Sequence, residues 1–179
     1  GLNVAVVRPS NAVGLRQHAE KLLPTFVRQA LTGQSLSIEG SGRQLRTFLN
    51  VMDLTEALKL VLQHGDPNGT YNIDGAETFC VLDVAEIVTE LAGCPCHVRY
   101  VPDRKVNDQA YMLDGRRLAA LGFCPKTLLR TTVTEILAAM RQTSLFDTPP
   151  LVPDFSSSTV DDPVVRLNDH ASATAEGNH

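Results

Sequence analysis

A run of apolar residues close to the start of the chain, Asn3-Val4-Ala5-Val6-Val7-Arg8, constrains the fold more than any other feature. The run does not alternate between apolar and polar residues, and it is rich in β-branched valine. This pattern is typical of a strand in a parallel sheet, which helices cover on both faces. Such a strand needs a neighbour on each side, and the remaining sequence offers no obvious set of them. We therefore expect that an element flanking this strand is missing from the chain.

The rest of the sequence predicts a mixed α/β fold in which helices alternate with short strands. Apolar residues at helical spacing predict helices at 22–31, from a cap at Asp53 to Gly65, at 82–91, from a cap at Asp114 to Leu121, and at 128–141. Strands are predicted at 36–39, 45–51, 70–73 and 97–101. These strands are too short to build a large sheet, so we expect a small lobe that is attached to something bigger.

The composition changes after Thr143, where Pro149-Pro150, Ser156-Ser157-Ser158 and scattered aspartates show almost no periodicity. Such a segment buries too little apolar surface to fold by itself. We therefore expect residues 1–143 to form the α/β lobe, with residues 1–14 as its first strand and loop. Residues 144–179 are predicted to be a flexible polar tail.

Charge and cysteine content narrow the function classes. The formal net charge of −4 argues against broad binding to nucleic acid or to acidic membranes. No stretch approaches the roughly 18 apolar residues of a membrane span. The apolar run from Val4 to Val7 is too short for the core of a signal peptide, so we expect none. The four cysteines are too few for a disulfide framework, which favours a reducing cytoplasmic location.

The run Cys94-Pro95-Cys96-His97 has the residue types of a metal site. A second ligand pair at zinc-finger spacing is absent from the sequence, which argues against bound metal. We expect instead a turn that leads into a strand, with the thiols buried as small hydrophobic groups.

A series of short motifs follows the first strand. The motifs are Arg8-Pro9-Ser10-Asn11 with Gly14, Arg16-Gln17-His18, Glu20-Lys21-Leu22 with Pro24, Leu36 to Gly40 with Gly42, Arg46 to Leu49 with Val51 and Asp53, Thr70-Tyr71-Asn72-Ile73 with Gly75, and Asp103-Arg104. In this order and at this spacing the chain resembles the dTDP-glucose 4,6-dehydratases, which are extended short-chain dehydrogenases of the NAD-dependent epimerase/dehydratase family. The resemblance covers nearly all of the predicted lobe. It implies the C-terminal substrate-binding lobe of such an enzyme, with the N-terminal Rossmann half absent. Residues 1–14 would then be the last Rossmann-type strand and its loop.

The resemblance also implies a binding site for a nucleotide sugar. The positions that would line it are Asn11, Glu20, Lys21, Leu22, Ser37, Arg46, Asn72, Arg104 and Asn107. Arginine donates in a planar fork that suits a diphosphate, and amide side chains serve sugar hydroxyls and phosphate oxygens. The helix start near Lys21 offers free N–H groups to an anionic oxygen. Pro9 and Ser10 would lie by the nicotinamide end of NAD, most of which the missing half would bind.

Each of these residues also has a structural interpretation. An isolated loop arginine is usually a solvated surface charge, and Glu20-Lys21 could be ordinary charges of a first helical turn. Asn72 could end a strand, and Asn11 could form a turn. The joint occurrence in family order favours the binding site.

Three departures from the family pattern leave the base and the sugar open. Val13 replaces an aromatic residue, Ser37 and Glu39 replace a proline and a tyrosine, and Lys105-Val106-Asn107 replaces Pro-Gly-His. These changes are compatible with a dehydratase, an epimerase or a decarboxylase that acts on a UDP- or dTDP-sugar.

Two motifs that the chemistry of such enzymes needs are absent from the sequence. None of the tyrosines at 71, 100 and 111 has lysine four positions later. Gly40-Ser41-Gly42 begins like a dinucleotide fingerprint, but Leu45 stands at the third glycine position. We therefore expect the isolated chain to be inactive, whereas a full-length parent would be an NAD-dependent lyase or epimerase and, by resemblance, a homodimer. A noncatalytic nucleotide-sugar-binding module and a partner-binding tail stay open as alternatives.

Overall fold

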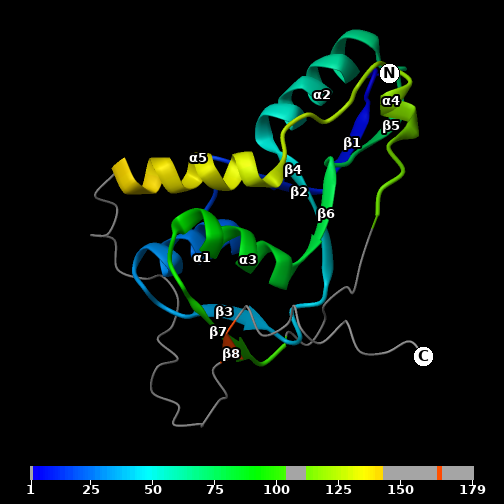
Figure 1. The fold of residues 1–179 in the computed structure, drawn as a ribbon. Coiled ribbons are helices and arrows are strands. Elements are labelled where there is room, and N and C mark those ends of the chain that lie inside the picture. Colours follow the sequence, from blue (N-terminus) through cyan, green and yellow to red (C-terminus); the bar gives the residue numbers. More distant parts are fainter. Residues whose placement is uncertain (1, 104–111, 143–164, 167–179) are drawn as a thin grey trace, which may run out of the picture.

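The computed structural model describes residues 2–103, 112–142 and 165–166, and the statements below concern these residues (Figure 1). Most of the predicted tail and the loop that contains Arg104 and Asn107 lie outside the described residues. The predicted α/β class is confirmed by an alternation of short strands and helices.

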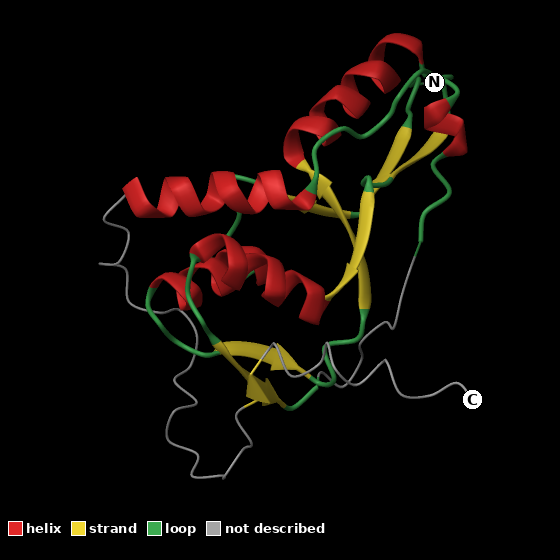
Figure 2. Cartoon of the chain, in the orientation of Figure 1, coloured by secondary structure: helices red, strands yellow, loops and turns green. Residues whose placement is uncertain are grey.

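The strands form three small sheets (Figure 2). β1 (Val6–Pro9) pairs in parallel with β5 (Thr70–Ile73). β4 (Leu45–Asn50) lies between β2 (Asn11–Val13), which is parallel to it, and β6 (Glu77–Cys80), which is antiparallel. β7 (His97–Val101) lies between β3 (Leu36–Glu39) in parallel and β8 (Val165–Arg166) in antiparallel orientation. The sequence did not predict β2, β6 or β8. β2 falls in a predicted loop, and β8 falls in the segment that was expected to be a tail.

The helices divide into two groups that build two hydrophobic cores. The helices are α1 (Leu22–Leu31), α2 (Val51–His64), α3 (Val81–Ala92), α4 (Arg116–Ala119) and α5 (Leu129–Gln142). The larger core lies among α1, α3 and α5 and the inner face of β3 and β7 (Figure 1). The smaller core joins α2 and α4 to β1, β4 and β5. Phe48 and Leu49, near the end of β4, contribute to one core each, so this strand connects the two.

The apolar run near the start forms a strand, but the predicted burial on both faces is wrong for the described chain. Val4 and Val6 are 51% and 45% exposed, and β1 has β5 as its one strand neighbour among the described residues. The exposed side is the one on which the sequence pattern predicted a further neighbouring element.

Two predicted helix caps differ from the structure. Asn50 caps α2, because its side-chain oxygen accepts a hydrogen bond from the Met52 N–H at 2.8 Å, and the helix starts at Val51. Asp53 lies inside the first turn instead. α4 begins after Gly115, although the Asp114 carboxylate still accepts from the Arg116 N–H at 3.0 Å.

None of the helices in the described ranges has the length and apolar character that a bilayer span requires. The same residues contain no group of three or more potential metal ligands, and Cys94 and Cys96 lie in the predicted turn before β7.

Candidate functional site

The candidate site is organised around a crossover at Ser10. The chain leaves its pairing with β5, where Arg8 lies opposite Asn72, and enters a pairing with β4, where Asn11 lies opposite Phe48. Between the two strands the Ser10 N–H donates to the Ile73 carbonyl at 2.9 Å. Asn11 and Asn72, which are far apart in sequence, therefore flank the same short segment.

Asn11 and Arg46 come from neighbouring strands. Asn11 Nδ2 donates to the Thr47 carbonyl at 3.0 Å, which holds its amide against β4. Arg46 is half-buried on β4, and its Nη1 donates to the Leu45 carbonyl at 2.8 Å. The structure thus brings one predicted cation and one predicted amide to adjacent strands.

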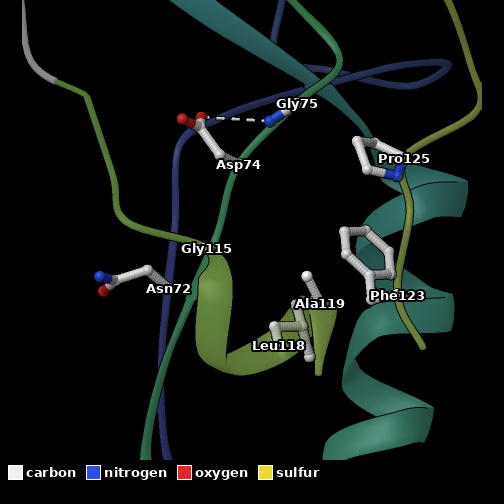
Figure 3. A pocket seen from close by; sticks show the side chains of 8 residues that line it. All are labelled: Asn72, Asp74, Gly75, Gly115, Leu118, Ala119, Phe123 and Pro125. Carbon is white, nitrogen blue, oxygen red and sulfur yellow. Dashed lines mark hydrogen bonds between the residues drawn. The ribbon is translucent and has the colours of Figure 1, made fainter. Parts of the chain in front are cut away.

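Asn72 lies at the rim of a small cavity of about 180 Å³ between β5, α4 and the segment that follows α4. Leu118, Ala119, Phe123 and Pro125 line the apolar part of this cavity. Figure 3 shows the Asn72 side chain pointing away from Phe123 and Pro125. Ligand pockets usually measure about 300–1,000 Å³, so this cavity is too small for a whole nucleotide sugar.

Only one of the two polar atoms of the Asn72 side chain has a hydrogen-bond partner among the described residues. Its Nδ2 donates to the Asp114 carbonyl at 3.1 Å, while its buried Oδ1 accepts from no described group. A buried amide oxygen without a donor is uncommon in folded proteins and is available to a ligand donor.

Asp114 fixes the carbonyl that holds Asn72. Its carboxylate receives hydrogen bonds from the Arg116 side chain, at 2.6 Å for Nη2, and from the Arg116 backbone N–H. These bonds to Arg116 lower the pKa of Asp114 from 3.8 to about 2. Asp114 therefore stays ionised at neutral pH. Sequence reasoning assigned Asp114 to a helix cap and missed its contact with Asn72.

Close packing beside this site requires a glycine at Gly75. A Cβ atom added there would lie 1.9 Å from the Phe48 carbonyl oxygen, which is far inside contact distance. The motif glycine is thus explained by the approach of two backbones at the end of β5.

Glu20, Lys21 and Leu22 mark the start of α1. Lys21 occupies the N-cap position without a side-chain cap, and Glu20 pairs with His18 at 3.6 Å on the surface. Leu22 is half-buried against the larger core. The predicted helix start near Lys21 is confirmed, but Glu20 and Lys21 precede the first turn of α1 instead of lying in it. Glu20 is a surface charge that pairs with His18.

Ser37 is engaged by neighbouring side chains. Its Oγ accepts from Gln29 Nε2 at 3.2 Å, and its N–H donates to Gln29 Oε1 at 3.2 Å. Arg99, its partner in the β3–β7 register, donates from Nη2 to the same Oγ at 3.5 Å. The sequence analysis did not predict a role for Arg99. The alternating pattern of β7 does not reveal which strand pairs with β7, so the contact between Arg99 and Ser37 could not be predicted.

Pro9 and Ser10, the predicted cofactor contacts, end β1 and begin the crossover. Ser10 is 7% exposed, and its buried Oγ has no partner among the described groups. An orphaned hydroxyl can form one hydrogen bond to a polar group such as a nicotinamide, so Ser10 fits a contact with one end of NAD.

Comparisons with known proteins agree with the motif pattern. The NAD dependent epimerase/dehydratase family matches residues 1–74. A trifunctional UDP-glucose 4,6-dehydratase/UDP-4-keto-6-deoxy-D-glucose 3,5-epimerase/UDP-4-keto-L-rhamnose-reductase of Arabidopsis thaliana is 39% identical over 129 residues, which are 71% of this chain and 19% of that protein. A dTDP-glucose 4,6-dehydratase of Actinoplanes is 36% identical over 143 residues, which are 79% of this chain and 45% of that protein.

The fold also matches solved structures. A dTDP-glucose 4,6-dehydratase of Streptomyces venezuelae, solved with NAD and TYD bound, superposes with a TM-score of 0.75 at 30% identity. The match covers 81% of this chain and 46% of that one. The chain thus spans about half the length of this structure and of the Actinoplanes protein, and less of the trifunctional protein.

Proposed function

Because this chain is related to the NAD-dependent epimerase/dehydratase family over part of the family's length, we propose that it is the nucleotide-sugar-binding C-terminal part of a 4,6-dehydratase. Its substrate would be dTDP- or UDP-glucose, and the product of the complete enzyme a 4-keto-6-deoxy sugar. The observation that carries the proposal is the similarity to 4,6-dehydratases over most of the described chain.

The crossover at Ser10 supports a binding role. Arg46 brings a guanidinium and Asn11 an amide to strands that meet there, and Asn72 brings an amide oxygen that has no partner among the described residues. A diphosphate needs fixed cations, and sugar hydroxyls need paired donors and acceptors. We assign the diphosphate to Arg46 and a donor group of the ligand to Asn72.

The exposed side of β1 supports a division of the active enzyme into two parts. In the parallel register, Val7 faces the smaller core together with Tyr71, whereas Val6 faces the opposite side together with Thr70. That opposite side is the exposed one, and a second α/β unit would bury it. In this proposal the second unit carries the catalytic pair and most of the NAD site.

NAD would supply the hydride acceptor of the reaction when it is bound. Pro9 and Ser10 would contribute one edge of its site, and Ser10 would donate or accept a single hydrogen bond through its orphaned hydroxyl. By itself the chain would bind the nucleotide sugar without converting it.

Binding of dTDP-glucose and UDP-glucose by isothermal titration calorimetry tests the proposal directly. We expect Arg46→Ala to lose about 1.5–3 kcal/mol of binding free energy, roughly a 10- to 150-fold weaker Kd, because a charge-assisted contact to phosphate is removed.

Arg43→Ala is the matched control, since Arg43 lies three residues away in the same segment but is exposed. It should leave Kd unchanged. Equal losses in the two variants, or no binding of either nucleotide sugar at millimolar concentration, would contradict the assignment.

An epimerase is the second candidate. The Arabidopsis relative combines 4,6-dehydratase and 3,5-epimerase activities in its name. Both candidates need a bound nucleotide sugar. Incubation of the complete protein with dTDP- or UDP-glucose distinguishes them, because a 4,6-dehydratase converts this substrate to a 4-keto-6-deoxy sugar and an epimerase does not.

A further inference from the structure

Two cysteine sulfurs meet in the turn between α3 and β7. Cys94 Sγ and Cys96 Sγ lie 3.1 Å apart, close enough for a thiol–thiol hydrogen bond. All four cysteines of the described residues are free thiols. The pair lies away from the crossover at Ser10 and plays no part in the proposed nucleotide-sugar site.

The backbone between the two cysteines explains why their sulfurs approach. The Cys96 N–H donates to the Cys94 carbonyl at 2.8 Å, which closes a three-residue turn with Pro95 at its centre. Such a turn requires a central φ near −75°, and the proline ring holds φ at about −65°. The sequence Cys-Pro-Cys therefore favours the close approach before any bond forms.

Neighbouring elements hold this turn on both sides. Gly93 ends α3 in the left-handed region with φ +70°, and the Gly93 and Cys94 N–H groups both donate to the Thr89 carbonyl. Arg141 of α5 donates to the Ala92 carbonyl at 3.1 Å. On the other side, Val98 pairs with Leu36. The two sulfurs are thus fixed by the fold rather than by each other.

The two thiols differ in their surroundings. Cys96 is 8% exposed and belongs to the larger core, whereas Cys94 is half-buried. Burial, together with the contact to Cys94, raises the pKa of Cys96 to about 12. The thiolate is the attacking form of cysteine, so the more accessible Cys94 reacts first with an external reagent.

We propose that Cys94 and Cys96 form a reversible dithiol–disulfide site that exchanges with the disulfide of a small thiol such as oxidised glutathione. The Cys94 thiolate attacks one glutathione sulfur, forms a mixed disulfide and releases one glutathione thiolate. Cys96 then gives up its proton to solvent and attacks the Cys94 sulfur, which releases the second glutathione. The protein loses two protons and two electrons, and one oxidised glutathione takes them up to become two reduced glutathiones.

Formation of this disulfide requires movement of the two cysteine side chains only. The sulfurs must approach from 3.1 Å to about 2.05 Å, a change that side-chain rotation within a preformed turn can supply. Oxidation should leave the far-UV circular dichroism spectrum unchanged.

The test uses the full chain, reduced and then equilibrated in glutathione buffers of increasing oxidised fraction. After acid quenching and alkylation, we expect labelling to fall from four cysteines to two, with an intact mass about 2 Da lower before alkylation. Peptide mapping should place both unlabelled cysteines in the peptide containing residues 94–96, and added dithiothreitol should restore four labels.

Matched variants separate this pair from the other two cysteines. A double variant, Cys80→Ser with Cys124→Ser, should lose both remaining labels over the same glutathione range. The Cys94→Ser variant should keep three labelled cysteines, except where a cysteine forms a mixed disulfide with glutathione. Full labelling of the unchanged chain at every glutathione ratio would overturn the proposal. So would a disulfide that maps to Cys80 or Cys124 or that links two chains. The unchanged chain decides these outcomes even if a variant fails to fold.

Discussion

Replacing Asp53 should destabilise the fold strongly, because this carboxylate joins α2 to the segment that leads into α5. Asp53 is 9% exposed, and its Oδ2 accepts from the backbone N–H groups of Lys126 at 3.1 Å and Thr127 at 2.8 Å. Hydrogen bonds to a charged group contribute roughly 1.5–3 kcal/mol each. Loss of both, with water entering to satisfy part of the freed N–H groups, should lower the free energy of unfolding by about 3–4 kcal/mol in Asp53→Ala.

Urea unfolding followed by circular dichroism measures this loss, with the slope compared between variants to check that the unfolding transition is unchanged. Glu56→Ala is the matched control on the same helix. Glu56 is exposed and pairs with Lys59 at 3.8 Å, so its removal should cost at most about 0.5 kcal/mol. The reasoning is refuted if Asp53→Ala loses less than about 1 kcal/mol, or if the Glu56 variant loses as much.

Two further outcomes follow from the structure. The pKa of Asp114 lies below its ordinary 3.8 in the folded chain, so its carboxylate stabilises the fold above about pH 4, and this contribution disappears as pH falls toward 2. A carboxyl NMR titration should therefore give a midpoint near 2, and Arg116→Ala should move this midpoint back toward 3.8. An unchanged midpoint in the variant would contradict the Arg116 pairing. The exposed apolar side of β1 should make the isolated chain self-associate. In sedimentation velocity, the Val6→Asp variant should be shifted toward monomer relative to a Leu15→Asp control. Sedimentation of the unsubstituted chain as a single monomer would contradict this expectation.

The sequence alone predicted most elements because their signals are local. Helical spacing of apolar residues located α1 at its observed ends, and β-rich runs located β3, β5 and β7 as observed. β6 was missed since Glu77–Cys80 carries little apolar pattern, and its pairing with β4 makes it a strand. The cap of α2 was assigned to Asp53 because both Asn50 and Asp53 are good cap residues, and the choice depends on where β4 ends.

The candidate site was less predictable because its contacts join distant parts of the chain. The Asn72 amide meets the Asp114 carbonyl across 42 residues, and Arg99 meets Ser37 across 62 residues. Composition and spacing predict which side chains would suit a nucleotide sugar, and this remains a prediction. They do not identify which strand each side chain lies beside, because pairing register is a property of the whole fold.

The two faces of β1 differ in exposure, and the exposed face carries residues of the proposed site. Arg8 and Asn72 are register partners, so they lie on the same face as Val6, which is the exposed face of the β1–β5 pair. On the other face of the β1–β5 pair, residues of α2 and α4 pack against the strands. Asp53 of α2 also accepts hydrogen bonds from the backbone N–H groups of residues 126 and 127. We expect a second α/β unit that buried Val6 to approach Asn72 as well, whose amide oxygen accepts from no described group. If the proposed function holds, the face of β1 that is exposed here would then lie between a cofactor-binding unit and the nucleotide-sugar site.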